Sequence, residues 1–500
     1  MLPPPPQSFV LPAKSWSDLT KGPKGKFKAH LTLEASQDFA LLDTFDQDLR
    51  RSGRLLLATS QALVLCQPDG LVVTQTAARR HFVADLPEGP VKTALADLSA
   101  LRCLLPQGQG NIASARLALL DNADKTCARA HLRLLTTDRG SAILVTLQGL
   151  LGYDKALAAM RHHLECCGVH PPVALCEALP GLPAYRAKPE IEIGSHDSVF
   201  DVVTRIVAAY LPVLRANESG IIADHDTEFL HDYRIGLRKI RLVLGLFKGT
   251  YRADRTAALR TRFAALMHAT GQLRDLDVAL LERNRAFSLL PPVLHPGLET
   301  LFVTLKAERQ AAHQTIAAHL QSRSYSDEIA DLTHLFTKPR HLGTGRIAEM
   351  PAQDFALRLI RVRHQKICTL AERITPETPD SDLHLLRLHL KKLRYLLEFF
   401  APIFPVLSFK TIRKALKELQ DLLGQFNDGS VQQLNLQAFL SQQPAGASLA
   451  MAQSVGALMA VLHGRQAAER AAALTALSAF TRPQLRANFD TMLSRAEEAL

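Results

Sequence analysis

The sequence is poor in cysteine and in aromatic residues, and it lacks long apolar runs. Its seven cysteines form no C-x-x-C pair and have no histidine at zinc-ligand spacing, which excludes a disulfide scaffold and disfavours a structural zinc site. No apolar run approaches the 18 or so residues of a membrane span. The segment 1–16 has neither the charged nor the apolar region of a signal peptide. We therefore expect a cytoplasmic protein.

Acidic residues are outnumbered by basic ones. The chain carries 59 Lys and Arg against 48 Asp and Glu, a net charge of +11, and residues 181–500 contribute +8 of it. A basic protein attracts polyanions such as nucleic acid, phosphate polymers or anionic lipid. With 47% apolar and 21% charged residues, the chain is typical of a globular protein with about two to four domains.

The residues before about 170 have the pattern of strands. Two β-type runs within 55–77 flank the turn signal Pro68-Asp69-Gly70, a second pair lies in 113–135, and a further strand is predicted at 141–148. Helical spacing follows at 154–168. Proline clusters predict a disordered leader over 1–25 and a linker over 170–195.

From 196 to 500 the apolar period changes to that of helices, and the helical region repeats itself. HDYRIGLRKIRLVLGLF (231–247) aligns with HLLRLHLKKLRYLLEFF (384–400) at seven of 17 positions, and GQLRDLDV (271–278) with GQFNDGSV (424–431) at four of eight. Both alignments have an offset of 153 residues. This predicts two homologous helical units, 196–322 and 350–480, packed around a pseudo-twofold axis.

The repeated segment carries an unmixed basic stripe. At 100° per residue, an arc of about 80° contains His231, Arg234, Arg238 and Arg241, and the second unit copies it with His384, Arg387, Lys391 and Arg394. Lys239 and Lys392 flank the two arcs. Like charges at these spacings repel one another, and few acidic residues stand nearby. A bound anion explains the stripe better than a solvated face does.

Further basic residues extend this pattern. One face of the helix predicted around 409–424 contains Lys410, Arg413, Lys414 and Lys417, and the equivalent helix of the first unit keeps only Arg260. Shorter stripes are Lys306, Arg309 and His313, and Arg465 with Arg470. Glu308 and Glu469 could neutralise these two, so both an anion contact and a solvated face stay open for Arg309 and Arg465.

These motifs resemble a known family. The pattern H-x-x-R-x-x-x-[RK]-K-x-R, followed by GQLRDLDV and GQFND, is similar to the CHAD domain, the conserved histidine α-helical domain, over 196–500. The resemblance implies two four-helix bundles with basic helices lining a central cleft. It also implies non-catalytic binding of inorganic polyphosphate, with no cofactor. The matching positions are His231, Arg234, Arg238, Lys239, Arg241, His384, Arg387, Lys391, Lys392 and Arg394, together with the basic helix 410–417.

The region 26–169 resembles in outline the CYTH domain, a β-barrel tunnel that binds or hydrolyses triphosphates. The family's first strand carries Glu-x-Glu-x-Lys, whereas FKAHLTLEA (27–35) has Glu34 as its one acid, with His30 and Thr32 at the alternate positions. Alternating carboxylates would hold Mg²⁺ or Mn²⁺ and polarise a phosphoryl group. Their loss predicts a degenerate domain without efficient triphosphatase activity, which serves as a scaffold or docks a partner.

The predicted fold class is therefore α+β multidomain, with an N-terminal antiparallel β-barrel or tunnel-like domain before the all-α domain of two bundles. We interpret Asp275 and Asp428 as acceptors that hold basic side chains, or as N-caps. His231 and His384 would donate to phosphate, best when protonated near pH 6. The alternatives are a metal-dependent triphosphatase in the N-terminal domain and nucleic-acid backbone binding, which the scarcity of aromatic residues disfavours. Association with polyphosphate granules and a homodimer are compatible with the sequence.

Overall fold

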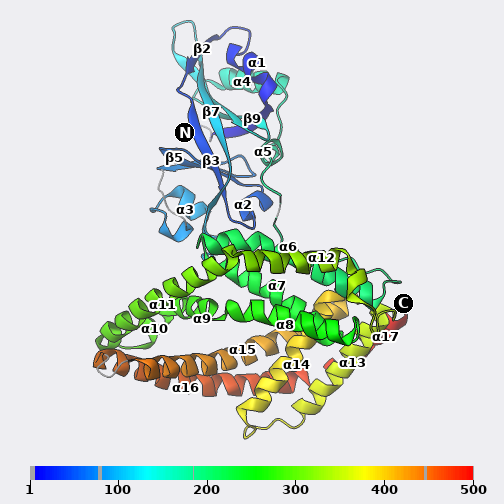
Figure 1. The fold of residues 1–500 in the computed structure, drawn as a ribbon. Helices are drawn as coiled ribbons and strands as arrows, with labels where there is room; N and C mark the ends of the chain where they lie inside the picture. Colours follow the sequence, from blue (N-terminus) through cyan, green and yellow to red (C-terminus); the bar gives the residue numbers. More distant parts are fainter. Residues whose placement is uncertain (1–5, 77–81, 184, 444–447, 499–500) are drawn as a thin grey trace. The chain divides into compact units, whose positions relative to one another are not determined.

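The structure is a computed structural model, and it describes residues 6–76, 82–183, 185–443 and 448–498. The chain divides into two compact units, Met1–Ala187 and Lys188–Leu500. The first is mainly β and the second is helical (Figure 1). None of the described helices is long and apolar enough to span a membrane.

The N-terminal unit is built on one antiparallel sheet. Its strands are β1 (Gln7–Pro12), β2 (Lys28–Leu33), β3 (Gln37–Asp43), β4 (Leu55–Ala58), β5 (Ala62–Cys66), β6 (Val72–Thr76), β7 (Leu105–Leu120), β8 (Thr126–Thr137) and β9 (Ser141–Gly149). The order is β1-β9-β8-β7-β3-β4-β5-β6, and β2 also pairs with β7. The sheet forms a half-barrel, and its end strands β1 and β6 do not pair with each other among the described residues. The predicted antiparallel β domain is therefore confirmed.

Short helices cover this sheet. They are α1 (Trp16–Lys21), α2 (Asp48–Arg51), α3 (Pro90–Ala94), α4 (Asp154–Cys166) and α5 (Ala174–Ala178). The apolar face of α4, with Ala156, Met160 and Leu164, packs into the core formed by β7, β8 and β9. A helix at 154–168 was expected from its spacing, and it ends close to the Gly168 stop signal.

Two N-terminal predictions are wrong. The segment predicted as a disordered leader pairs as β1 with β9, from Gln7 to Pro12, and continues into α1; residues 1–5 of that leader lie outside the described residues. The predicted linker belongs to the β unit as far as the unit boundary at Ala187. Leu175 and Leu179 are buried in the sheet core, and Arg50 holds the same segment by donating hydrogen bonds to the carbonyls of residues 176 and 179 at 2.6 and 2.7 Å. The prolines of this segment indicate irregular backbone, but they do not indicate that the segment is separate from the β unit.

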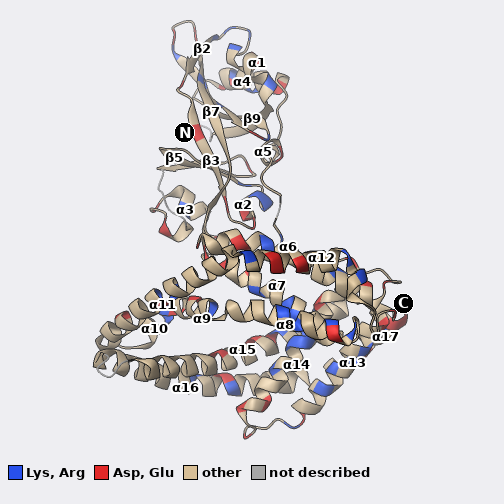
Figure 2. Ribbon diagram, in the orientation of Figure 1, with Lys and Arg blue, Asp and Glu red and all other residues tan. Residues whose placement is uncertain are grey.

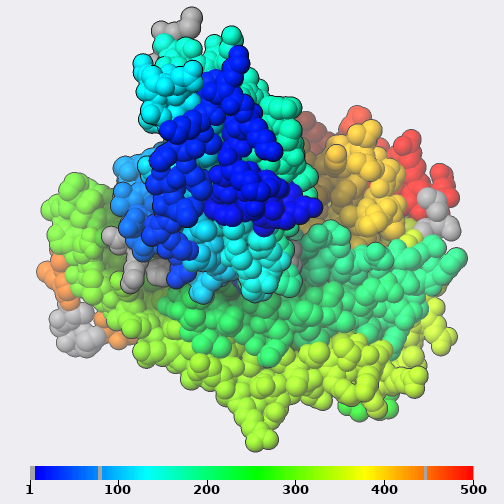
Figure 3. All heavy atoms as spheres, turned by 90° about the horizontal axis from the view of Figure 1, so that it is seen from above, coloured from blue at the N-terminus to red at the C-terminus, as the bar shows by residue number. Residues whose placement is uncertain are grey.

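The helical unit consists of two successive sets of helices. The first set is α6 (Val199–Ile222), α7 (Thr227–Leu246), α8 (Ala253–Ala269), α9 (Gly271–Leu281), α10 (Arg283–Leu289), α11 (His295–Gln321) and α12 (Arg323–Thr337). The second set is α13 (Ala352–Ala371), α14 (Asp380–Phe399), α15 (Val406–Gln442), α16 (Leu449–Phe480) and α17 (Pro483–Glu498). The closing helices α12 and α17 extend each set beyond the predicted ends at 322 and 480. On the face seen in Figure 3, α6 lies beside α11 and α12, with which it packs.

The two sets repeat at the offset seen in the sequence. The starts of α6, α7 and α8 recur 153 residues later as the starts of α13, α14 and α15. Equivalent helices also pack on each other: α6 on α13, α7 on α14 and α11 on α16. At the start of α6 and α13 the contact is reciprocal, because the Val199 amide donates to the Met350 carbonyl and the Ala352 amide to the Asp197 carbonyl, both at 2.9 Å. Such isologous contacts are those of a twofold axis within one chain.

Candidate anion-binding site

The basic stripe of α7 lies beside α8 and α9. Arg234 donates to the Met267 carbonyl at 3.0 Å and to the Thr270 hydroxyl at 2.8 Å, and its buried Nε has no hydrogen-bond partner. Burial lowers the pKa of Arg234, and the charges of Arg238, Arg274 and Arg241 lower it further against the opposing effect of Asp275. Several guanidinium groups therefore stand close together.

Arg238 and Arg241 complete the stripe without an acid of their own. Neither has a hydrogen bond or ion pair with a residue of the described ranges, and Arg241 is exposed. His231 accepts a hydrogen bond at Nδ1 from Arg274 of α9, at 2.9 Å. This contact places Arg274, a residue that the sequence analysis did not assign, next to the stripe. Its position in the repeated GQLRDLDV motif was the available signal.

The equivalent stripe lies on α14. Arg387 is 3.6 Å from Asp428, Arg394 is 3.5 Å from Glu398, and Lys391 has no hydrogen bond or ion pair with a residue of the described ranges. His384 donates from Nδ1 to the Asn427 side-chain oxygen at 2.7 Å. Asn427 is the twofold equivalent of Arg274, so each histidine contacts the same position of the repeated motif at 271–278 and 424–431.

The pseudo-twofold axis brings the two stripes together. Arg238 and Lys391 occupy equivalent positions, 153 residues apart, on the packed helices α7 and α14. Burial, together with the charges of Arg238, Arg387 and Arg394, lowers the pKa of Lys391 to about 8, while Asp428 acts in the opposite direction. Repulsion between like charges is thus built into the centre of the helical unit. Figure 2 shows basic segments of α7, α8 and α14 gathered there.

We call this group the central basic cluster: Arg234, Arg238, Arg241, Arg274, Arg387, Lys391 and Arg394. The carboxylates found near it are Asp275, Asp428 and Glu398. Glu398 also pairs with Lys239. The positive charge of the cluster is therefore incompletely balanced, and an anion with several negative charges would stabilise it.

Lys239 and Lys392 flank the arcs as expected, but they face other surroundings. Lys239 is 5% exposed, lies 3.1 Å from Glu398, and stands over the rings of Tyr210, Tyr395 and Phe399. Its position does not support the expected contact with an external anion, because its charge is already neutralised in the core. Lys392 belongs to a separate group of bases on α13 and α14.

Arg309 is also occupied by the protein itself. Its Nε donates to Asp277 at 2.8 Å, and its terminal nitrogens contact Asp224. Asp277 is 2% exposed, and these two carboxylates raise the pKa of Arg309 against the effect of burial. Of the two interpretations left open for Arg309, the structure favours an internal ion-pair network. The sequence analysis missed Asp277 and assigned its neighbour Asp275.

The remaining predicted contacts are exposed. On α15 these are Lys410, Arg413, Lys414 and Lys417, and elsewhere they are Arg260 of α8 and Arg465 of α16. Lys414 and Lys417 pair with Glu418 and Asp421 one turn along the helix, and exposed pairs of this kind are weak. Arg470, by contrast, is tied to Asp380 and to the carbonyl of Pro376.

The predicted acceptor roles differ between the two aspartates. Asp428 pairs with Arg387, as expected of an acceptor that holds a basic side chain. Burial raises the pKa of Asp275 above its ordinary value, although the nearby charges of Arg234 and Arg274 act in the opposite direction. Neither residue is an N-cap, since Asp275 lies inside α9 and Asp428 inside α15.

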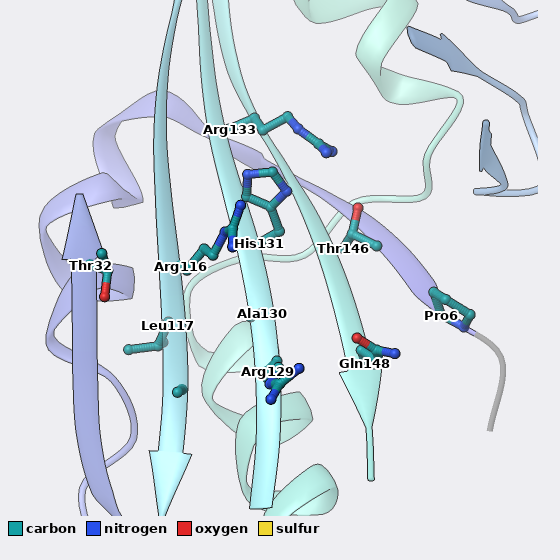
Figure 4. Close-up of a pocket in the computed structure, with 11 residues that line it drawn as sticks. Pro6, Thr32, Arg116, Leu117, Arg129, Ala130, His131, Arg133, Thr146 and Gln148 are labelled. Atoms are coloured by element: carbon teal, nitrogen blue, oxygen red, sulfur yellow. The ribbon is translucent and has the colours of Figure 1, made fainter. Parts of the chain in front are cut away.

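The sheet of the N-terminal unit carries a second candidate site. A cavity of about 490 Å³ lies over β2, β7, β8 and β9, and it is lined by Arg116, Arg129, His131 and Arg133 among others (Figure 4). None of the described lining residues is acidic. Glu34, the one acid of the first strand motif, is 2.6 Å from Arg116 and 3.3 Å from His131. Burial lowers the pKa of His131, and Arg133 adds to this effect.

The residues around Glu34 and the cavity are poor ligands for a divalent cation. Mg²⁺ and Mn²⁺ prefer carboxylate and other oxygen ligands, and Glu34 is already paired with a guanidinium. No group of three His, Cys, Asp or Glu in the described ranges is arranged to hold a metal ion. The cavity offers positive charge and hydrogen-bond donors instead.

Parts of the chain are similar to known proteins. Residues 205–437 match the family model of the CHAD domain. The CHAD domain from the plant Ricinus communis is similar in structure, with a TM-score of 0.50 and 28% identity, over 60% of this chain and 98% of that one. PptA from Streptomyces chartreusis has a TM-score of 0.43 and 18% identity, over 55% of this chain and 99% of its own. A proposed adenylate cyclase from Bacillus halodurans has a TM-score of 0.22 and 16% identity, over 32% of this chain and 87% of its own. No curated protein matches this chain.

Proposed function

The helical unit of this chain contains a CHAD domain, and we propose that it binds inorganic polyphosphate through the central basic cluster. The observation that carries this proposal is that Arg238 and Lys391, at equivalent positions of the packed helices α7 and α14, repel each other electrostatically, while neither forms an ion pair within the described residues. Clustered like charges with perturbed pKa values are characteristic of functional sites, where a ligand of opposite charge relieves the repulsion.

Polyphosphate matches the cluster in charge and in shape. It carries about one negative charge per phosphate along a flexible chain. Each arginine can bind two oxygens with its planar fork, and lysine acts as a mobile point charge. Several contacts on one chain act in concert, because each contact after the first is effectively intramolecular.

The exposed bases of α15 extend the proposed path. Lys410 and Arg413 have no acid partner within the described ranges, and Lys414 and Lys417 have weak ones. Arg260 of α8 is the twofold equivalent of Arg413 and is exposed like it. We propose that these residues and Arg465 add affinity for long chains. His231 and His384, held by Arg274 and Asn427, would donate to phosphate oxygens at the edge of the cluster.

We propose that the protein does not hydrolyse triphosphates in its N-terminal unit. The ion pair of Glu34 with Arg116 and the basic lining of the cavity support this proposal. The hydrolase alternative needs a divalent cation, and release of phosphate from a triphosphate with Mn²⁺ would establish it. The nucleic-acid alternative is tested by competition, since a polyphosphate-specific site should prefer short polyphosphate over duplex DNA at equal charge.

The test is calorimetric titration of long-chain polyphosphate into the full chain at two salt concentrations. The variant Arg238→Ala/Lys391→Ala removes this pair of bases. A control of equal charge change is Lys338→Ala/Arg340→Ala, at two exposed positions far along the sequence from either stripe. We expect tight binding that weakens with salt, a loss of at least tenfold in the Arg238→Ala/Lys391→Ala variant, and little change in the control. No binding by the folded wild type, or equal losses in both variants, would overturn the proposal.

A further inference from the structure

The pseudo-twofold axis provides an internal comparison for the two flanking lysines. In the first copy, Lys239 is neutralised by Glu398 at 3.1 Å and packed against Tyr210 and two other rings. Its equivalent in the second copy is Lys392. If the second copy were built alike, Lys392 would also meet an acid and an aromatic ring.

The second copy differs at each of these positions. The equivalent of Glu398 is Gly245, and the equivalent of Tyr210 is Arg363. Lys366 replaces Val213, one turn from Arg363 on α13. Lys248 lies one turn beyond Gly245, next to Phe247, whose ring is 5.6 Å from that of Phe355 on α13. The acid is thus replaced by a glycine, and two bases stand where the first copy has an aromatic ring and a valine.

We call Lys248, Arg363, Lys366 and Lys392 the second basic cluster. Arg363 donates from Nη1 to Nδ1 of His389 at 3.0 Å, and His389 is 6% exposed. The buried Nε of Arg363 has no hydrogen-bond partner. The guanidinium is therefore held in place by a neutral histidine while one of its donors remains unused.

The electrostatics of this cluster agree with the geometry. Burial, with the charges of Arg363, Lys366 and Lys248, lowers the pKa of Lys392. Burial, with the charges of Arg363, Lys366 and Lys392, lowers the pKa of His389 to about 4. No carboxylate contributes to either shift, in contrast to Lys391, which feels Asp428.

We propose that the second basic cluster is a separate binding site for a phosphate-type oxyanion. The anion takes the place that the Glu398 carboxylate has beside Lys239, and it accepts hydrogen bonds from Arg363 and Lys392. Space exists at this point, because a Cβ added to Gly245 would meet nothing within 4 Å. The site rests on different residues from the proposed polyphosphate function, so either can fail alone. Its ligand is a terminal stretch of the chain held at the central cluster or a separate short phosphate.

The test restores the acid that the first copy has. In the full chain carrying Arg238→Ala/Lys391→Ala, Gly245→Glu should pair with Lys392 and occupy the site, whereas Gly245→Gln has the same size without the charge. Both changes replace a helical glycine, so neither should impair the fold. The probe is tripolyphosphate, titrated by calorimetry at low ionic strength. We expect the Glu variant to bind it about tenfold or more weakly than the Gln variant, because a charge-assisted contact is lost.

Equal affinities in the Glu and Gln variants would overturn this inference and leave the central cluster untouched. Long-chain polyphosphate then identifies the source of the ligand in the wild-type background. If Gly245→Glu weakens long-chain binding, one chain spans both clusters. If it does not, and wild type saturated with long chain still binds tripolyphosphate, the site takes a separate phosphate. Both of these results support the site.

Discussion

The low pKa of Lys391 makes a quantitative prediction about proton uptake. With a pKa of about 8 in the free protein, this lysine is about half protonated at pH 8 and about one-tenth protonated at pH 9. An anion bound beside it should return its pKa to the ordinary value near 10.4. Binding of polyphosphate should therefore take up about 0.1 proton at pH 7, half a proton at pH 8 and 0.9 at pH 9.

The rise of proton uptake with pH is the signature of a lysine. Histidines that become protonated on binding give an uptake that falls above pH 7, because they are too weakly basic to hold a proton at pH 9. The assay is calorimetry of long-chain polyphosphate binding in two non-phosphate buffers with different ionisation enthalpies, whose difference in heat gives the protons taken up.

The matched variants are Lys391→Met and Lys338→Met. Lys338 is an exposed lysine outside the proposed contacts, so its replacement should leave the uptake at pH 9 unchanged, whereas Lys391→Met should remove most of it. Equal uptake at pH 9 in wild type and Lys391→Met would refute the reasoning, because the proton would then enter elsewhere.

The remaining predictions concern stability, salt and catalysis. Lys391→Met should raise the free energy of unfolding of the unliganded protein at pH 7 by about 1–3 kcal/mol in urea titrations. The reason is that a lysine with a lowered pKa destabilises the fold below pH 8, and this cost disappears as the pH rises from 8 toward 10.4. A lower free energy of unfolding in the variant would contradict the inference that the charge of Lys391 is unfavourable. Asp277→Asn should lower that free energy by about 1–3 kcal/mol, because Arg309 loses a buried partner, yet polyphosphate affinity should persist. The slope of log affinity against log salt should be about 1.4 shallower for Arg238→Ala/Lys391→Ala, at roughly 0.7 per lost cation on a single-stranded polyanion. An unchanged slope would show that Arg238 and Lys391 do not contact the polyphosphate. Phosphate release from tripolyphosphate with Mn²⁺ should equal that of a Glu34→Gln variant, and a higher rate in wild type would revive the hydrolase alternative.

Local patterns predicted much of the architecture. The 153-residue repeat, the change of apolar period near 196 and the turn signals of the β unit all depend on residues close in sequence. The predicted leader and linker were wrong because proline limits the local backbone but does not report what a segment packs against. Residues 7–12 became a strand through β9, more than 100 residues away.

The spacing of the basic residues is enough to predict which side of each helix carries them, since a helical period converts spacing directly into a face. It could not decide which bases lack acids, because their partners come from other helices. Lys239 meets Glu398 across the axis, and Arg309 meets Asp224, which is 85 residues away. Arg238 and Lys391 become neighbours once two units pack about one axis. Only the tertiary structure settles such pairings, because electrostatic energy depends on distance in space and on burial rather than on sequence separation.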